Sequence, residues 1–395
     1  MTDPIIHEAF TRLFAWCRQH DFAGHDPFDA LNSKLFQVTP FRNSATARLL
    51  WTQTLKRSPL DLRSIALVPP QKNAKGIALF ALAALADFRR TKSREVEAEA
   101  RALLEELISL RLGTAHGVAW GYNFDWQSRV FFAPRGTASI VPTAFAARAL
   151  LTAAIAFNEK SYFELARGVC DFIVADLPRS VESPTAVCFS YTPDANTRIF
   201  NASLLAAETL ARVGAHDARA DYCELAVRAA RYVITQQKSN GSWSYGADAN
   251  QSWIDNFHTA YLLSSLKAII DSCEVAQADE FRTALRLGYE YWSKSFFLAD
   301  GWAKYYHDTL YPVDTHAAAA AIVSLLDLME LDSDALSLAE RIAIWSIQNL
   351  RDRQGFFYYQ RRRFYTVRTP FMRWTQAWML YALARLLEAQ SAPSQ

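Results

Sequence analysis

GIALFALAALADFRR (residues 76–90) is followed after two residues by SREVEAEARALLEELISLRL (93–112), and this pair of segments decides the fold. Apolar residues recur at helical spacing in both segments. The first has no charge before Asp87, which predicts a helix buried on all sides, whereas the second has an apolar stripe and a charged face, which predicts a helix half in water. The same succession returns in PTAFAARALLTAAIAF (142–157) and KSYFELARGVCDFIVADL (160–177). Buried inner helices and half-exposed outer helices therefore alternate.

This alternation repeats along the chain. Segments of the inner type begin near residues 76, 140, 199, 255, 314 and 370, roughly 55 to 64 residues apart. Such a period is typical of an array of helical hairpins, and six hairpins close into a double ring. We therefore predict an all-α fold, an (α/α)6 toroid with long loops on one face. Residues 1–75 form an N-terminal helical segment that completes or covers the ring, and residues 76–395 form the toroid, within one domain.

The connections between the helices are unequal in length. Links from an inner to the next outer helix are short, near Asn158, Gly214 and Asp332. Links from an outer to the next inner helix are long, and loops longer than about 12 residues are uncommon unless they serve a function. These long loops cover approximately residues 113–138, 176–198, 238–254, 297–313 and 352–369. In a ring of alternating helices they all emerge at one end, where we expect the functional site.

Glycines and aromatic residues are concentrated in those loops. Three loops share a polar residue, then glycine, then aromatic residues, as in NGSW (240–243), DGW (300–302) and QGFF (354–357). Glycine at this place fits a tight hairpin that turns the chain over the end of the ring. Tryptophan and tyrosine stack on the apolar faces of sugar rings. We expect the loop aromatics to line a mouth and bind a sugar there, namely Trp243, Tyr245, Trp302 and Tyr358.

The composition excludes several classes of function. The chain has 395 residues, 51% apolar and 21% charged, and a formal charge of +2, which lacks the basic excess of a nucleic-acid-binding protein. No run of 18 or more uncharged apolar residues predicts a membrane span, and the N-terminus lacks the pattern of a signal peptide. The five cysteines are odd in number and form no CxxC motif, so we predict reduced, mostly buried thiols in a cytoplasmic protein.

Motifs for cofactors are missing from the sequence. Neither GxxxxGK[S/T] nor GxGxxG occurs, so a nucleotide cofactor is not expected, and no Gly-x-Ser-x-Gly elbow is present. Asp221-x-Cys223 and Asp271-x-Cys273 have the spacing of part of a zinc site, but the predicted helices place both away from the long-loop end. We predict no cofactor and no metal.

The longest loop contains WGYNFDWQSR (120–129), which combines stacking and hydrogen-bonding side chains. Carboxylate, amide and guanidinium groups bind sugar hydroxyls or carboxylates in a ligand pocket. Asp125 is a candidate catalytic residue, although an ion pair between Asp125 and Arg129 that only orders the loop explains the same residues. The expected substrate-binding residues of this loop are Tyr122, Asn123, Trp126, Gln127 and Arg129.

WIDNFHTAYLL (253–263) begins an inner helix. Asp255 is the expected N-cap, and Asn256 and His258 lie in the first turn, where free backbone N–H groups and the helix dipole favour anions and a neutral histidine. His258 and Asp255 are therefore candidate catalytic residues and Asn256 a substrate-binding residue. The alternative is that Asp255 only caps the helix and that His258 is a core histidine.

The next inner helix repeats this arrangement with Asp314 and His316, and Tyr305 and Tyr306 lie in the loop before it. A tyrosine and a histidine that face one cavity can abstract and return a proton alpha to a carboxylate, the step shared by uronate lyases and C5-epimerases. We therefore predict Tyr306 and His316 as catalytic residues and Tyr305 as a substrate-binding residue. Asn256, Arg373 and the arginines of QRRRFYTVR (Arg361, Arg362, Arg363 and Arg368) are expected to neutralise the substrate carboxylate, although such a basic run is more often a solvated face.

Hydrolysis of a glycosidic bond needs two facing carboxyl groups instead. Four aspartates are expected at the long-loop end, so such a pair is available, although any of the four can be a helix cap. These residues are Asp125, Asp194, Asp255 and Asp314.

The helix pairs with glycine-aromatic loops resemble the (α/α)6 toroids, a class that includes glycoside hydrolases, polysaccharide lyases, uronyl epimerases, N-acylglucosamine 2-epimerases and the terpenoid cyclases. Four blocks also resemble bacterial proteins associated with exopolysaccharide biosynthesis: GHDPFDALNS (24–33), KRSPLDLR (56–63), WGYNFDWQSR and WIDNFHTAYLL. The resemblance implies a carbohydrate-active enzyme with an oligosaccharide or polysaccharide substrate, and other proteins of that pathway as partners. A non-catalytic glycan-binding protein and a polyprenyl- or terpenoid-binding toroid are the alternatives.

Overall fold

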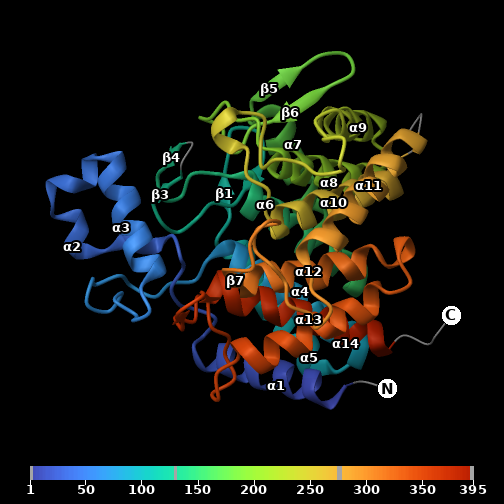
Figure 1. The fold of residues 1–395 in the computed structure, drawn as a ribbon. Helices are drawn as coiled ribbons and strands as arrows, with labels where there is room; N and C mark the ends of the chain where they lie inside the picture. Colours follow the sequence, from blue (N-terminus) through green and yellow to red (C-terminus); the bar gives the residue numbers. More distant parts are fainter. Residues whose placement is uncertain (1–2, 129–130, 274–277, 392–395) are drawn as a thin grey trace.

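The computed structural model describes residues 3–128, 131–273 and 278–391. Its long helices form two concentric layers (Figure 1). The outer helices are α1 (Pro4–Gln19), α5 (Arg94–Ser109), α7 (Lys160–Ala175), α9 (Ala220–Ile234), α11 (Ala278–Phe296) and α13 (Ala335–Leu350). The inner helices are α4 (Ala74–Thr91), α6 (Ile140–Phe157), α8 (Phe200–Asp217), α10 (Asn256–Ser272), α12 (Thr315–Asp327) and α14 (Trp378–Ser391), the last preceded by the π-helical turn η5 (Met372–Ala377).

The inner helices close into a ring. Each packs against the next in chain order, and α14 packs against α4 to complete the circle. Alanine allows this close approach because its side chain is small, as in the run 317–321 of α12, which is buried throughout. The predicted (α/α)6 toroid is confirmed, and the inner helices begin within a few residues of the predicted starts.

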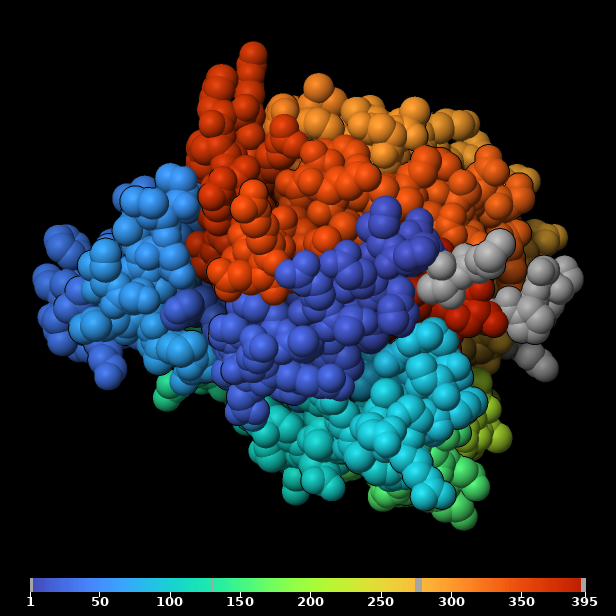
Figure 2. All heavy atoms as spheres, turned by 90° about the horizontal axis from the view of Figure 1, so that it is seen from below, coloured from blue at the N-terminus to red at the C-terminus, as the bar shows by residue number. Residues whose placement is uncertain are grey.

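Glycines in the long loops show how the outer layer is ordered. Gly241, Gly301 and Gly355 all have positive φ, at +88°, +93° and +107°, which confirms the tight hairpins predicted there. Each lies against the backbone of the next outer helix: a Cβ on Gly241 would be 2.3 Å from the Leu287 carbonyl oxygen of α11, and one on Gly301 would be 2.3 Å from that of Arg341 in α13. A Cβ on Gly355 would be 3.0 Å from backbone of Arg12 in α1. Helix α1 therefore follows α13 in the outer layer, as Figure 2 shows from below.

Short strands occur at the N-terminal ends of the inner helices. The loops before α6 and α8 contain three antiparallel hairpins, two in the first loop and one in the second, and in the loop before η5 β8 pairs with β9 of the same loop and with β7. An isolated bridge between Asp255 and Tyr306 joins two further loops. The strands are β1 (Leu112–Gly113), β2 (Val118–Ala119), β3 (Trp126–Gln127), β4 (Phe132–Ala133), β5 (Arg179–Glu182), β6 (Val187–Phe189), β7 (Val313–Asp314), β8 (Gln360–Arg361) and β9 (Thr366–Val367).

Residues 20–73 separate α1 from α4 and form an insertion at the long-loop end (Figure 1). The insertion contains η1 (Asp29–Asn32), α2 (Lys34–Gln37), η2 (Pro40–Asn43) and α3 (Ala45–Arg57). It has a small core of its own, made by Ala30, Leu55, Ala66 and Val68 under Trp51. The first 75 residues thus supply one outer helix and an additional structure beside the mouth of the ring.

Two observations concern the predicted environment of the chain. Cys223 of α9 and Cys273 at the end of α10 are 50 residues apart in sequence and form a disulfide. The prediction of five reduced thiols is therefore wrong for this pair. This removes the cysteine argument for a reducing compartment. Helix α6 is long and apolar enough to cross a membrane, but 67% of it is buried inside the protein, as expected for a core helix.

Candidate functional site

A cavity of about 230 Å³ lies where the inner helices begin. Its floor is built by one position repeated six times: the second residue after each N-cap points toward the centre of the ring. Every member of this set lines the cavity, and we call the set the floor residues: Lys75, Val141, Asn201, Phe257, His316 and Arg373. The cavity therefore receives the N-terminal ends of six helix dipoles, which favour negative charge.

The floor residues divide into a basic arc and an apolar arc. His316, Arg373 and Lys75 come from α12, η5 and α4, which are neighbours in the ring. Val141 and Phe257 lie opposite, on either side of Asn201. The Asn201 Oδ1 atom is buried without a hydrogen-bond partner among the described residues. One side of the floor thus attracts anions, and the other offers apolar surface and an amide oxygen for a hydroxyl group.

Lys75 is 2% exposed, and no described carboxylate forms an ion pair with it. Its Nζ lies 3.4 Å from the Tyr261 hydroxyl and 4.3 Å from the centre of the Phe145 ring. Burial lowers the pKa of Lys75 well below its ordinary value, with a further contribution from Arg373. Lys75 is therefore held by a hydroxyl and aromatic faces with no described carboxylate, and an anionic ligand beside it would favour the protonated form that burial disfavours.

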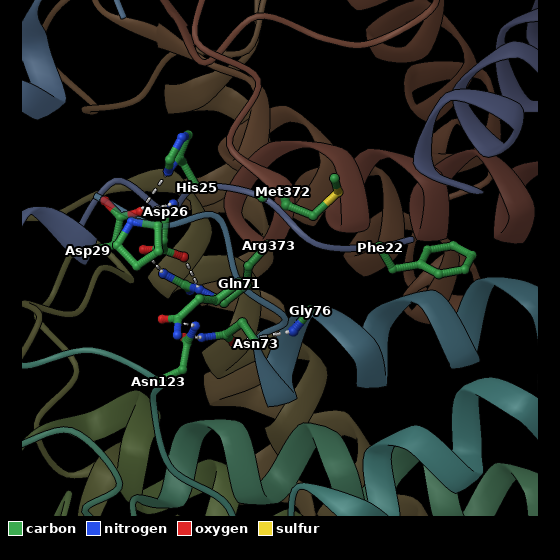
Figure 3. Close-up of a pocket in the computed structure, with 12 residues that line it drawn as sticks. Phe22, His25, Asp26, Asp29, Gln71, Asn73, Gly76, Asn123, Met372 and Arg373 are labelled. Carbon is green, nitrogen blue, oxygen red and sulfur yellow. Dashed lines mark hydrogen bonds and ion pairs between the residues drawn. The ribbon is translucent and has the colours of Figure 1, made fainter. Parts of the chain in front are cut away.

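Arg373 is held by the insertion. Its Nη2 donates to Asp26 Oδ1 at 2.8 Å, and its Nε donates to the other oxygen of the same carboxylate. Figure 3 shows this pair beside Asn73, which caps α4 and donates to Asn123 Oδ1 at 2.6 Å. Next to it, the fully buried Arg63 donates to Asp29 at 2.9 Å. The block GHDPFDALNS thus supplies the two carboxylates that fix the insertion and Arg373 in place.

Aromatic rings form the cavity walls. Tyr245 and Trp253 stack with their ring centres 4.4 Å apart, and Tyr305 and Tyr306 lie at 4.7 Å from each other. Burial raises the pKa of Tyr305 well above its ordinary value, so this phenol keeps its proton. Such rings present apolar faces and hydroxyl groups together, which suits a sugar. The aromatic wall residues are Tyr122, Trp126, Tyr191, Tyr245, Trp253, Tyr305, Tyr306 and Trp374.

Asp255 and His258 form a polar pair in the cavity wall. Asp255 caps α10 by accepting from the His258 backbone N–H at 3.0 Å, and its second oxygen lies 2.7 Å from His258 Nδ1. Trp253 Nε1 donates to the same oxygen at 3.1 Å. The carboxylate is 1% exposed and the imidazole 20%. Asp255 therefore both caps the helix and fixes the imidazole, and His258 lines the cavity with no hydrogen bond from its Nε2 to a described residue.

His316 does not repeat this pairing. Its N-cap Asp314 is two residues before it, whereas Asp255 is three residues before His258, so the two rings lie at different angles. His316 Nε2 lies 2.6 Å from the Tyr261 hydroxyl, and burial lowers the pKa of His316 well below its ordinary value. Asp314 accepts from Gln360 Nε2 at 3.0 Å and from Trp374 Nε1 at 3.1 Å, and it does not line the cavity. His316 is therefore a neutral floor residue, and Asp314 acts as the N-cap of α12.

Helix α3 of the insertion forms one side of the entrance, with Leu49, Gln53, Lys56 and Arg57. Lys56 Nζ lies 4.1 Å from the centre of the Phe28 ring and 5.6 Å from that of Trp374. Burial lowers the pKa of Lys56 to about 8, an effect that Asp314 opposes. The insertion thus adds positive charge to the cavity.

The structure brings ten of the predicted site residues to the cavity: Tyr122, Trp126, Gln127, Tyr245, Asp255, His258, Tyr305, Tyr306, His316 and Arg373. Asp125 lies outside it and accepts from the Arg135 backbone N–H at 2.8 Å. Arg129 lies outside the described residues. Asn123, Trp243, Asn256, Trp302, Tyr358 and Arg361 also line no part of it.

These outlying residues make local structural contacts. Trp243 Nε1 donates to the Val233 carbonyl at the end of α9, and Trp302 Nε1 donates to the Leu310 carbonyl within its own loop. Asn256 is fully buried and donates to the Lys304 carbonyl at 2.9 Å. Tyr358 donates to Asp352, and Arg361 to Asn349. The expected mouth aromatics are therefore divided, since Tyr245 reaches the cavity and Trp243, Trp302 and Tyr358 do not.

Sequence reasoning missed several cavity residues, including Lys75, Asn201, Tyr191 and Lys56. Asn201 has a signal in the sequence, because it lies two residues after a predicted inner-helix start, as His316 does. Lys75 has that offset only from the observed N-cap Asn73, since the predicted start at residue 76 follows it. Tyr191 and Lys56 have none, since only the folded loops and the insertion bring them to the mouth. Among the described residues, no group of three or more His, Cys, Asp or Glu side chains has the arrangement of a metal site.

No family model matches the chain, and no curated protein matches its sequence. Solved structures are similar to it. An unsaturated glucuronyl hydrolase from Bacillus sp. GL1, responsible for the degradation of glycosaminoglycan, aligns over 97% of this chain and 96% of its own, with a TM-score of 0.61 and 13% identity. A cellobiose 2-epimerase from Bacillus thermoamylovorans aligns over 81% of this chain and 88% of its own, with a TM-score of 0.61 and 13% identity.

A GH76 α-mannanase from Bacteroides thetaiotaomicron aligns over 80% of this chain and 86% of its own, with a TM-score of 0.60 and 12% identity. At such identities the likeness concerns the fold and not the chemistry. These comparisons and the closed double ring agree that the chain has the (α/α)6 toroid fold.

Proposed function

We propose that the chain is a carbohydrate-active enzyme that abstracts the proton alpha to the carboxylate of a uronate sugar bound in the central cavity. The observation that carries this proposal is the pair of Asp255 and His258. With Asp255 accepting from His258 Nδ1–H, the tautomer is set and the Nε2 lone pair becomes the base. The buried carboxylate also stabilises the imidazolium that forms when the proton is taken up.

The basic arc of the floor supports an acidic sugar. A carbon next to a carboxylate loses its proton more readily when preorganised positive groups stabilise the developing charge. Lys75 lies among aromatic faces without an ion pair to a described carboxylate, and Arg373 is the next floor residue in the ring, followed by the neutral His316. We assign the substrate carboxylate to this arc, with Lys75 as its main partner.

The later steps use the phenols of the wall. After proton abstraction, the carbanion either expels the substituent on the neighbouring carbon, as a lyase does, or takes a proton on its opposite face, as an epimerase does. Tyr305 keeps its proton because of burial, and it lies next to Tyr306. One of these two hydroxyl groups is the proton donor in our proposal.

Three comparisons support sugar chemistry, because the similar structures bear the names of a glucuronyl hydrolase, an epimerase and a mannanase. The sequence blocks that resemble exopolysaccharide-associated proteins favour a substrate from a bacterial polysaccharide. Hydrolysis by two carboxyl groups has less support, since Asp255 is the single carboxylate among the described cavity-lining residues.

The test measures exchange of the alpha proton with solvent. The chain is incubated with uronate-containing oligosaccharides in D2O, and deuterium at the carbon next to the carboxylate is followed by NMR together with elimination products. Asp255→Asn keeps the oxygen that caps α10, but its amide donates to His258 Nδ1 and places the proton on Nε2. We expect exchange to fall about 10²- to 10⁴-fold, the contribution of a general base.

A matched control exists on the surface, where His116 Nδ1 lies 2.5 Å from Asp176 outside the cavity. Asp176→Asn changes an identical type of pair and should leave exchange unchanged. Equal exchange by the wild type and Asp255→Asn would refute the role of the pair. Binding of the oligosaccharide without exchange or elimination would instead favour a non-catalytic glycan-binding protein.

A further inference from the structure

Large apolar side chains are exposed on two segments beside the cavity entrance. One segment is residues 34–67 of the insertion, and the other is residues 361–368, which cover most of the β8–β9 hairpin; together we call them the entrance face. Six large apolar residues of this face are 62% to 86% exposed, and Ile155 is the one other described residue in that range. The six are Val38, Phe41, Leu50, Leu60, Ile65 and Phe364.

The same face is strongly basic. Residues 34–61 contain five lysines or arginines and one acidic residue, and residues 361–368 contain four arginines and no acidic residue. The whole chain has a formal charge of only +2, so the positive charge is concentrated here. None of these nine basic residues forms an ion pair with a described carboxylate. They are Lys34, Arg42, Arg48, Lys56, Arg57, Arg361, Arg362, Arg363 and Arg368.

The two segments touch each other next to the cavity. The Tyr365 hydroxyl donates to the Arg57 carbonyl at 3.3 Å, which connects the hairpin to the end of α3. Lys56 and Arg57 of α3 also line the cavity entrance. In Figure 2 the hairpin projects from the body of the molecule beside the insertion. Whatever covers this face is therefore held directly at the mouth of the ring.

We propose that the entrance face binds the surface of a lipid bilayer that contains anionic headgroups. Unpaired arginines and lysines gain affinity from anionic lipids, and exposed Phe, Leu and Ile side chains gain further by entering the region between headgroups and acyl chains. Large apolar side chains exposed on two segments that touch each other are the kind of surface that marks an interaction site. An acidic polysaccharide would satisfy the arginines but offers no apolar interior for Phe364 and Ile65, so the bilayer explains both observations.

This inference is independent of the reaction in the cavity. It places the mouth of the ring at the membrane, where a glycan attached to a lipid or to a membrane-bound machine can reach the cavity. Arg363, Phe364 and Arg368 of this face are exposed and do not line the cavity, so they can be changed without altering Asp255, His258 or the floor residues.

The experiment is flotation of the full chain with vesicles. We expect binding to phosphatidylcholine vesicles that contain phosphatidylglycerol, little binding to phosphatidylcholine alone, and weaker binding at high salt. The double variant Arg363→Glu/Arg368→Glu should weaken binding at least about 25-fold, because each arginine near an anionic surface contributes roughly fivefold. Phe364→Ser should weaken it about tenfold through loss of apolar burial.

Matched controls lie elsewhere on the surface. Arg94→Glu changes an exposed arginine and Ile155→Ser an exposed apolar residue, both outside the entrance face, and neither should change flotation. Failure to float with anionic vesicles would overturn the proposal, as would equal losses in the control variants. Retention on an acidic polysaccharide that Phe364→Ser leaves unchanged, without vesicle binding, would assign the face to a glycan instead.

Discussion

Gly301→Ala tests how the hairpins fix the outer layer. Gly301 has a φ of +93°, and an added Cβ would lie 2.3 Å from the carbonyl oxygen and 2.4 Å from the carbonyl carbon of Arg341 in α13. Both atoms belong to helix backbone, which cannot rotate away as a side chain would. The substitution therefore combines backbone strain with an overlap that only a shift of the loop relative to α13 relieves.

The two costs are separable because the chain offers comparison glycines. Gly136 also has a positive φ, +79°, but an added Cβ meets nothing within 4 Å. Gly136→Ala should cost only the conformational strain, about 1–2 kcal/mol. Gly301→Ala adds a packing shift of about 1–3 kcal/mol, for a total of about 2–5 kcal/mol. Gly113 has neither a positive φ nor a neighbour, so its alanine variant should be neutral or slightly stabilising.

The assay is thermal unfolding followed by circular dichroism. A chain of 395 residues has an unfolding entropy of about 0.8 kcal/mol/K, so each kcal/mol lowers the midpoint by about 1 °C. We expect a fall of about 2–6 °C for Gly301→Ala, about 1–2 °C for Gly136→Ala and none for Gly113→Ala. Equal midpoints for the Gly301 and Gly136 variants would refute the packing of the hairpin on α13, and with it the contact that orders the outer helices.

Two further predictions concern buried ionisable groups. Burial lowers the pKa of Lys75, and a bound uronate carboxylate would raise this pKa again, so that binding takes up a proton. The affinity for the uronate should therefore fall with rising pH, by up to about tenfold per pH unit. Calorimetry in buffers of different ionisation enthalpy should detect the proton uptake, and Lys75→Met should abolish it. Burial also raises the pKa of Asp314 from 3.8 to about 6, so the folded state binds the extra proton and stability should decline as pH rises through that window. Asp314→Asn should flatten this decline relative to the wild type, and an unchanged pH profile of the unfolding midpoint would contradict the assignment.

The double ring could be predicted because its causes are local. A run such as residues 76–86 contains no polar face, so it must be surrounded, and a run such as 93–112 must have one side in water. The hairpin glycines could also be predicted, since a residue with positive φ against a helix backbone has to be glycine. The structure of the insertion was harder to predict from the sequence, because Arg63 and Asp29 are 34 residues apart and nothing in their spacing indicates that they pair.

Only some of the loop aromatics reach the cavity, and the sequence does not show which, because this depends on contacts in the folded chain. Trp243 and Tyr245 are two residues apart and have similar side chains, yet Trp243 caps the Val233 carbonyl of α9 while Tyr245 stacks on Trp253 at the cavity. Residues two apart point to the same side of an extended strand, but residues 242–245 form no strand, so the two rings are free to take different sides. Sequence composition identifies the loop as aromatic, but the side each ring takes depends on which neighbouring helix end has an unpaired carbonyl.

The floor residues suggest a rule that works in the other direction, from fold to sequence. Once six inner-helix caps are located, the residue two positions after each cap can be read as cavity floor, whatever its type. Here that position holds lysine, histidine and arginine on three consecutive helices of the ring and valine, asparagine and phenylalanine on the others. Lysine and arginine are almost never buried with an unpaired charge, so at a position that the fold forces into the centre each needs a compensating charge, or, in the case of lysine, loses its proton more readily. Arg373 has Asp26 for this purpose, and Lys75 has none among the described residues. The missing charge at Lys75 is therefore the strongest reason to expect that the ligand of this toroid is an acid.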